Sequence, residues 1–216
     1  MISGGSTSAR DGAARGRKGT TSRIAACVQA LLLLSLLAPA ATQAEPPLAL
    51  DELLQALRKP ERSQARFVET RYLKILKRPL ELTGTLVFAP PDRLERHTLT
   101  PREQSMVADG DRLTLEDKAR GRVRTLALRD HPVLWAFIES FRATLTGDRS
   151  MLERFYEVQL AGSRARWQVS LTPRDAAMAA VVSRIRIAGS AGRVASVEIE
   201  EARGDRSVMT ILEVAP

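Results

Sequence analysis

The sequence predicts a mostly β fold with helices, in which a curved sheet of about ten strands forms an incomplete antiparallel β-barrel covered by a helical lid. Two sets of short segments alternate apolar and polar residues and are joined by close connections, as expected for antiparallel strands. They lack the strand–helix alternation of a parallel sheet. A helical pattern separates the two sets. Because a sheet of this size must curl, close or split, a partly curled one needs a cover on its concave face.

The elements follow in order along the chain. A short helix comes first, with four leucines on one stripe between Leu50 and Leu57, Asp51 as its cap and Pro60 beyond its end. Asp109-Gly110 is a strong hairpin turn between two strands. Strands are predicted at residues 67–76, 80–88, 93–100, 104–108, 112–116, 123–128, 156–161, 165–172, 183–188, 193–202 and 207–214.

The segment between the two sets of strands predicts a helix over residues 132–146. Asp130 is its expected cap, Pro132 suits its first turn and Gly147 suits its end. Its apolar stripe consists of Leu134, Phe137, Ile138, Phe141 and Leu145. The stripe fits two interpretations, a core helix packed on the sheet and a lid over a cavity, and periodicity does not separate them. A second short helix is expected at residues 149–155.

Residues 1–44 predict a cleaved secretory signal peptide. Five basic residues precede an almost wholly apolar run at residues 24–38, and Pro39 and small residues then lead to Ala44. The apolar run is shorter than the ~20 residues that span a bilayer as a helix. A membrane anchor remains the rival interpretation, and the exact cleavage position stays open. Cleavage predicts a bacterial envelope protein whose residues 45–216 form a single domain.

The composition of residues 45–216 excludes several classes of function. These 172 residues carry 28 basic and 24 acidic side chains, spread as on an ordinary solvated surface. A nucleic-acid-binding protein would show a concentrated basic patch with stacking aromatics. The one cysteine, Cys27, precedes this domain, so the domain is expected to hold no disulfide, thiol nucleophile or cysteine metal site. We therefore expect no nucleic-acid partner and a monomer that its core alone holds together.

No catalytic or cofactor motif occurs in the sequence. His97 lies in a predicted strand and His131 at a helix start, and neither belongs to a Ser-His-Asp or metal-ligand pattern. Glu198 and Glu200 alternate with apolar residues, which a solvated strand face explains without acid–base catalysis. The sequence therefore predicts a protein that is not an enzyme, with no catalytic residues, no metal and no cofactor.

Apolar residues that share faces of the predicted elements suggest a cavity with a roof. Leu82, Leu86 and Phe88 lie on one face of the second strand, opposite polar neighbours. The predicted cavity lining is Phe67, Leu82, Leu86, Phe88, Leu94, Met106 and Trp167. The predicted lid residues are Trp135, Phe137, Ile138 and Phe141.

Several segments of the chain resemble the periplasmic outer-membrane lipoprotein carrier family, LolA. The resemblance is carried by Phe67-Val68-Glu69, Gly84 to Pro101, Gln104 to Gly110, Trp167 to Pro173 and Gly204 to Ile211. In the second and third of these, a strand that ends in proline is followed by a Val-x-Asp-Gly hairpin, with the family's spacing. The resemblance extends over almost the whole of residues 50–214, and the chain is identified as a divergent member.

Membership implies a carrier whose open barrel and lid enclose an apolar cavity for the acyl chains of a lipoprotein. It implies uptake from an inner-membrane ABC release complex and delivery to an outer-membrane receptor. Two alternatives stay open: a LolA-like lipid-binding sensor or adaptor of the envelope, and a carrier of a non-lipoprotein lipid made by a neighbouring biosynthetic pathway. The family's arginine that latches the lid is replaced by Pro90 here, and Arg93 or Arg96 is the possible substitute.

Overall fold

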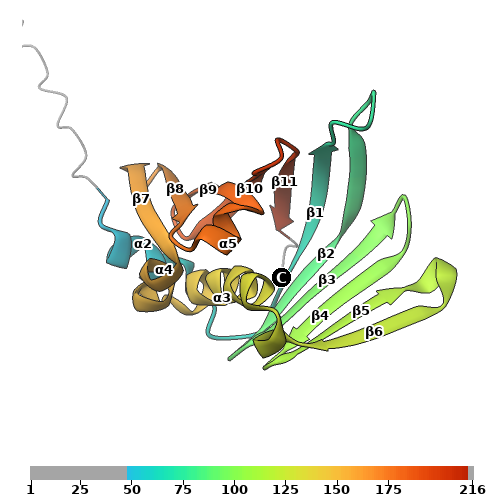
Figure 1. Ribbon diagram of the computed structural model, residues 1–216. Coiled ribbons are helices and arrows are strands. Elements are labelled where there is room, and N and C mark those ends of the chain that lie inside the picture. The colour runs from blue at the N-terminus through green and yellow to red at the C-terminus, as the bar shows by residue number, and fades with distance from the viewer. Residues whose placement is uncertain (1–47, 214–216) are drawn as a thin grey trace, which may run out of the picture. The chain divides into compact units, whose positions relative to one another are not determined.

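The alternating segments form one sheet of eleven antiparallel strands within residues 48–213, the part of the chain that the computed structural model describes (Figure 1). The strands are β1 Ser63–Tyr72, β2 Leu80–Ala89, β3 Arg93–Thr100, β4 Gln104–Asp109, β5 Arg112–Asp117, β6 Arg122–Ala127, β7 Tyr156–Ser163, β8 Arg166–Pro173, β9 Val182–Ser190, β10 Arg193–Glu201 and β11 Arg206–Glu213. The helices of the same region are α2 Leu50–Leu57, α3 Pro132–Thr146, α4 Arg149–Phe155 and α5 Ala176–Ala179, with 3-10 turns η1 Lys118–Arg120 and η2 Leu128–Asp130.

The sheet is a barrel that does not close. Its strand order is β6-β5-β4-β3-β2-β1-β11-β10-β9-β8-β7, so β6 and β7 form its two edges. The first strand pairs with the last, with Phe67 opposite Ile211, and this pairing joins the two sets of strands into one sheet. The chain between the edges forms η2, α3 and α4. The predicted fold class, an incomplete antiparallel barrel with a helical cover, is confirmed.

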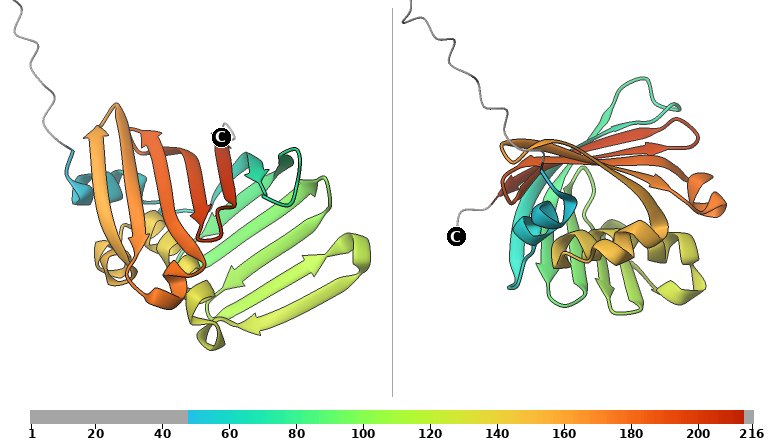
Figure 2. Two further views of the ribbon diagram at one scale, coloured as in Figure 1. Left: turned by 45° about the horizontal axis from the view of Figure 1, so that its top comes forward. Right: turned by 90° about the vertical axis from the view of Figure 1, so that its left-hand side faces the viewer.

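Helix α3 lies in the hollow of the curved sheet. Figure 2 shows it between the half formed by β1–β6 and the half formed by β7–β11. Val133, Phe137 and Phe141 pack against the core of the second half, whereas Leu134 and Ile138 pack with the first. The apolar stripe predicted from the sequence is therefore wide enough to contact both halves of the sheet.

Two groups of buried apolar side chains form the core. The larger group lies mainly on β8–β10 and includes Trp167, Leu171 and Ile185, each 1 % exposed. The smaller group lies on β4, β5 and η2. Helix α3 belongs to both groups, through Ala143 in the larger and Ile138 in the smaller. Lifting α3 off the sheet would thus expose apolar surface on both sides.

Three local predictions were wrong. The first strand, expected at residues 67–76, runs from Ser63 to Tyr72, and residues 73–79 form an exposed loop that begins with a turn. Neither Asp51 nor Asp130 caps its helix. Ala49 and His131 hold the cap positions and make no side-chain cap hydrogen bond. Asp51 lies instead in the first turn, where its charge still favours the positive end of the helix.

The predicted signal peptide, residues 1–44, lies outside the described residues. Residues 48–213 belong to one compact unit, Glu45–Pro216. In this part of the chain no helix is both long and apolar enough to cross a membrane.

Candidate functional site

A cavity of about 1280 Å³ lies between α3 and the concave face of the sheet. This volume is above the range of ~300–1,000 Å³ that is common for small-molecule sites. Both halves of the sheet and one face of α3 form the wall, so the cavity exists because the barrel stays open and α3 covers it. Its size suits a ligand larger than an ordinary cofactor.

Aliphatic and aromatic side chains form most of the cavity wall. The first half of the sheet contributes Leu86, Phe88, Leu94 and Met106. The second half contributes Ile187, Val194, Val197, Ile199, Met209 and Ile211. Helix α3 contributes Val133, Leu134, Phe137, Ile138 and Phe141. A wall of this kind favours burial of a hydrocarbon ligand, because each apolar group that leaves water stabilises the complex.

The structure brings most of the predicted site residues together. Leu86, Phe88, Leu94 and Met106 line the sheet side of the cavity, and the predicted lid residues Phe137, Ile138 and Phe141 line the opposite side. The remaining four predicted residues, Phe67, Leu82, Trp135 and Trp167, do not line it. That any of these side chains binds lipid stays a prediction.

Phe67 packs against both Gly84 and Arg96. Its register partner on β2 is Gly84, and a Cβ on Gly84 would lie 2.8 Å from the Phe67 ring. The guanidinium of Arg96 lies over the ring, 4.8 Å from its centroid. The phenyl ring, 1 % exposed, therefore fills the space left by the glycine and lies beneath the arginine instead of in the cavity wall.

The other three residues belong to neighbouring packing sites. Trp167 covers Gly189 and donates its indole N–H to the carbonyl oxygen of Ala191 at 2.9 Å, within the core of the second half of the sheet. Trp135 meets Phe155 of α4 edge-on, with ring centroids 5.2 Å apart. Leu82 is buried opposite Glu69 in the strand register, where charged side chains gather.

One cluster of charged side chains lies on the concave face, at the wall of the cavity. Glu69 has a side chain that is 3 % exposed, accepts from Arg71 Nε at 2.9 Å and pairs with Arg96. All three residues line the cavity. Burial alone would raise the pKa of Glu69, but the hydrogen bonds and charges of Arg71 and Arg96 outweigh it and hold the pKa below its ordinary value of 4.5. The carboxylate thus stays ionised and neutralises one of two arginines in an apolar setting.

Neither arginine predicted as the lid latch contacts α3 through a hydrogen bond or ion pair found in the described residues. Arg93 pairs with Glu95 at 2.7 Å and with Asp109 at 2.5 Å, and Arg96 pairs with Glu69. Both side chains are held by carboxylates of the sheet itself, and a latching role for either arginine stays a prediction. The hydrogen bond that joins α3 to the sheet is donated by an arginine of α3 itself.

Arg142 makes this connection. Its Nη2 donates to the carbonyl oxygen of Gly110 in the β4–β5 turn at 2.9 Å, and its Nη1 pairs with Glu139 at 2.5 Å. The residue is 6 % exposed, and its Nε is buried without a hydrogen-bond partner among the described residues. The sequence does carry a trace of this role, because Arg142 follows Leu134 and Ile138 at intervals of four residues on an otherwise apolar helix face.

The sequence reasoning also missed the wall formed by the second half of the sheet. Val197 and Ile199 of β10 line the cavity, and they alternate with Glu198 and Glu200, which pair with Arg186 outside the wall. This alternation was visible in the sequence. What the sequence did not contain was the β1–β11 pairing, which turns this face of β10 toward α3.

The described residues do not contain a group of three or more His, Cys, Asp or Glu side chains that could hold a metal ion. The cavity combines a mostly hydrocarbon wall with the charged cluster around Glu69 and a helical cover. Chemically, this arrangement can enclose an apolar or amphiphilic ligand.

The chain is similar to one family of known proteins and to several solved structures. Residues 40–215 match the family described as outer membrane lipoprotein carrier protein LolA-like. Similar solved structures include a LolA superfamily protein from Nitrosomonas europaea, 11 % identical, with 77 % of this chain and 93 % of that one covered and a TM-score of 0.42. A putative outer membrane lipoprotein-sorting protein domain from Vibrio parahaemolyticus is 10 % identical, with 75 % and 88 % covered and a TM-score of 0.43.

An uncharacterised conserved protein from Thermus thermophilus is 10 % identical, with 76 % of this chain and 82 % of that one covered and a TM-score of 0.46. No curated protein sequence matches the chain. The match to the family spans residues 40–215 and so includes every strand and helix described above. The chain therefore belongs to the outer membrane lipoprotein carrier protein LolA-like family.

Proposed function

We propose that this protein is a periplasmic carrier that binds the acyl chains of lipoproteins, or of a related acylated lipid, in the cavity beneath α3. It takes them up at the inner membrane and delivers them to the outer membrane. The observation that carries the proposal is the cavity of about 1280 Å³, whose wall is mostly hydrocarbon and whose cover is one helix. Family membership supports the same class of ligand.

A carrier must bind its cargo and also release it. Each methylene group that enters the cavity contributes ~0.8 kcal/mol, so a long acyl chain would bind too tightly for transfer if nothing opposed it. Phe137 and Phe141 oppose it here, because they line the cavity and also pack with the core of the second half of the sheet. Cargo that displaces them loses part of its binding free energy to the cost of moving the helix.

Transport between two membranes requires partners at both. An inner-membrane ABC release complex would load the carrier, and an outer-membrane receptor would accept the cargo. The signal peptide proposed at residues 1–44 would place the protein in the periplasm between them. The chemistry of the reaction is transfer without a covalent step, so we propose that the protein is not an enzyme.

The proposal is tested by lipid that copurifies with the protein. The full chain is expressed in a bacterial host and recovered from the envelope fraction, and its bound lipid is extracted and identified by mass spectrometry. Leu86→Trp places an indole in the cavity wall, whereas Val123→Trp, at a position 66 % exposed on β6, changes the surface only. The protein and Val123→Trp should carry acylated lipid, and Leu86→Trp should carry much less.

A transfer assay separates a carrier from an envelope sensor with the same fold. The loaded protein is mixed with acceptor vesicles, and movement of a fluorescent acyl lipid into them is followed. A carrier releases the lipid to the vesicles. Lipid that copurifies and is never released would contradict shuttling, and absence of acylated lipid from the unaltered protein would overturn the proposed ligand.

A further inference from the structure

The loop between β1 and β2 exposes large apolar side chains. Ile75 is 90 % exposed, Leu76 is 45 % exposed, and Tyr72 at the end of β1 is 42 % exposed. An isolated exposed apolar residue needs no explanation, but three within five positions concentrate exposed apolar side chains on one loop. We name residues 72–79 the β1–β2 tip.

The tip is held in place by defined contacts. Leu76 N–H donates to the carbonyl oxygen of Leu73 at 2.9 Å, which closes a turn. Lys74 N–H donates to the carboxylate of Asp205 at 2.9 Å, so the loop is fixed to the β10–β11 turn. The Arg206 guanidinium lies over the ring of Tyr72, 4.5 Å from its centroid. The apolar side chains are therefore presented by an ordered loop and do not fold back onto the domain.

Basic residues flank these apolar residues in the sequence. The tip contains Lys74, Lys77 and Arg78, and it contains no acidic residue. Many other basic side chains of the domain pair with a carboxylate, as Arg93 and Arg149 do. Within residues 48–213, no ion pair is found for Lys77 or Arg78. Apolar side chains flanked by cations of this kind match a lipid bilayer, which has a hydrocarbon interior and an anionic head-group surface.

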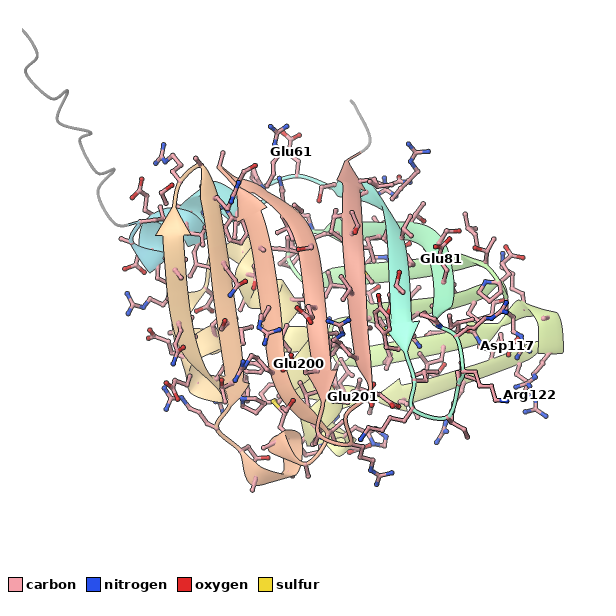
Figure 3. All side chains as sticks on the ribbon, turned by 90° about the horizontal axis from the view of Figure 1, so that it is seen from above. Glu61, Glu81, Asp117, Arg122, Glu200 and Glu201 are labelled. Carbon is pink, nitrogen blue, oxygen red and sulfur yellow. The ribbon has the colours of Figure 1, made fainter. Side chains whose placement is uncertain are left out.

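The tip lies where the cavity reaches the surface. Leu73, Arg71 and Arg206 line the cavity, and so does Val181, which is 50 % exposed. Figure 2 shows the β1–β2 loop, the β10–β11 turn and α5 at the same end of the domain. Figure 3 shows Glu201, the last residue of β10, at the opposite end of the sheet from Glu61, which precedes β1. An object bound to the tip would thus face one mouth of the cavity.

We propose that the β1–β2 tip docks on an anionic lipid bilayer, with Ile75 and Leu76 inserted among the head groups and Lys74, Lys77 and Arg78 against the lipid phosphates. Apolar insertion and attraction of Lys and Arg to anionic lipid reinforce one another in interfacial binding. Docking in this way directs the mouth at Leu73 and Val181 toward the membrane. The docking rests on the tip alone, whereas its use in cargo transfer rests on the proposed function.

Vesicle sedimentation tests the docking. The full chain, recovered from the envelope fraction, is mixed with vesicles of phosphatidylethanolamine and phosphatidylglycerol, or with vesicles of phosphatidylcholine alone. The variants are Ile75→Ser and the charge variant Lys77→Gln/Arg78→Gln. The matched controls on the exposed edge strand β6 are Val123→Ser and Arg122→Gln. Every protein has the same N-terminal segment and undergoes the same processing, so any contribution of that segment cancels in the comparison.

We expect Ile75→Ser to weaken binding to the anionic vesicles by about tenfold, because it removes most of one inserted apolar side chain. The charge variant should bind anionic vesicles less and lose the dependence of binding on salt, and the controls should bind as the unaltered protein does. Equal binding by Ile75→Ser and Val123→Ser would overturn the proposal and leave a protein partner as the occupant of the tip. Stronger binding to phosphatidylcholine than to anionic vesicles would also overturn it.

Acyl-probe binding, measured without vesicles, keeps this test separate from that of the proposed function. Ile75→Ser lies outside the cavity wall and should bind the probe normally. Normal probe binding with lost vesicle binding supports docking. If the unaltered protein binds vesicles but does not bind the acyl probe, the carrier function is contradicted and the docking proposal stands.

Discussion

Arg142 of the lid helix donates a hydrogen bond of 2.9 Å to the carbonyl oxygen of Gly110, in the turn between β4 and β5. The bond fastens α3 to the half of the sheet that contains β4 and β5. Its geometry also leaves Arg142 Nε buried without a partner in the described part of the chain. A buried unpaired donor costs free energy, and opening the lid returns this donor to water. In the proposed movement of α3, this gain would offset part of the cost of breaking the hydrogen bond to Gly110.

Replacing Arg142 by methionine should loosen the lid. The variant loses a hydrogen bond from a charged donor and leaves Glu139 without its partner, which we expect to lower the free energy of unfolding by ~2 kcal/mol. Binding of a fluorescent acyl probe should become tighter, because the helix competes less for the cavity wall. Urea unfolding and probe titration on the same variant check both effects.

Arg129→Met is the matched control. Arg129 pairs with Asp111 of the same turn at 2.6 Å, but its side chain is 76 % exposed, so its loss should change stability little. Weaker probe binding in Arg142→Met, or equal effects of the two substitutions, would contradict the role of Arg142 as a latch.

Phe141→Ala should cost less stability than an ordinary core truncation. Phe141 meets Phe137 edge-on at 5.0 Å and packs against the core of the second half of the sheet, but it also borders the cavity, so it is only partly buried. Truncation of a fully packed aromatic costs ~3–5 kcal/mol, and we expect ~1–2 kcal/mol here together with a changed affinity for the acyl probe. Denaturant unfolding and probe binding measure the two quantities.

Leu171→Ala provides the comparison, because Leu171 is 1 % exposed and does not line the cavity. It should cost ~2–5 kcal/mol and leave probe affinity unchanged. Phe141→Ala could instead lower the free energy of unfolding as much as Leu171→Ala does and leave the affinity for the acyl probe unchanged. In that case α3 is a plain core helix and the lid interpretation is wrong.

Glu69 should make the domain sensitive to acid. Its folded-state pKa lies below the ordinary value of 4.5, so its contribution to stability is present above that pH and is lost as the pH falls through the folded-state pKa. Glu69→Gln should lower the free energy of unfolding at neutral pH by ~3 kcal/mol, because Arg96 is left in the wall without its partner. It should also flatten the pH dependence below 4.5.

Denaturant unfolding between neutral and acidic pH measures this effect, with Glu103→Gln as control. Glu103 pairs with Lys118 at the surface, where such pairs contribute little. A pH profile of Glu69→Gln that remains as steep as that of the unaltered protein would show that other carboxylates govern the acid response.

Local periodicity predicted the elements well where one face of an element is apolar. Helix α3 was expected at residues 132–146 and is found there, because Pro132 and Gly147 mark its ends and its stripe has a clear period. The end of β1 could not be predicted in the same way. Residues 73–76 continue the apolar content of the strand, and only the turn from Leu73 to Leu76 shows that the strand has ended.

Face-sharing on one strand predicted only part of the cavity wall. Leu86 and Phe88 share a face of β2 and line the wall, but Leu82 on the same face does not. Val87, between Leu86 and Phe88, does line it. Trp167 does not line the wall, because a large aromatic residue on an alternating strand fits a filled core as well as a cavity. Arg142 was missed because its partner is a backbone carbonyl, and the sequence carries no mark of which carbonyl a side chain will reach.

The central claim is that an acyl chain binds in the cavity beneath α3, and locating a bound acyl chain tests it most directly. A photoreactive fatty-acid analogue is bound to the protein and activated, and the attachment positions are mapped by proteolysis and mass spectrometry. We predict adducts on β2 and β3 around Leu86 and Leu94, on β10 around Val197, and on α3 around Phe137, all displaced by unlabelled lipid. Adducts confined to the exposed edges β6 and β7, or adducts that unlabelled lipid does not displace, would contradict binding in the cavity beneath α3.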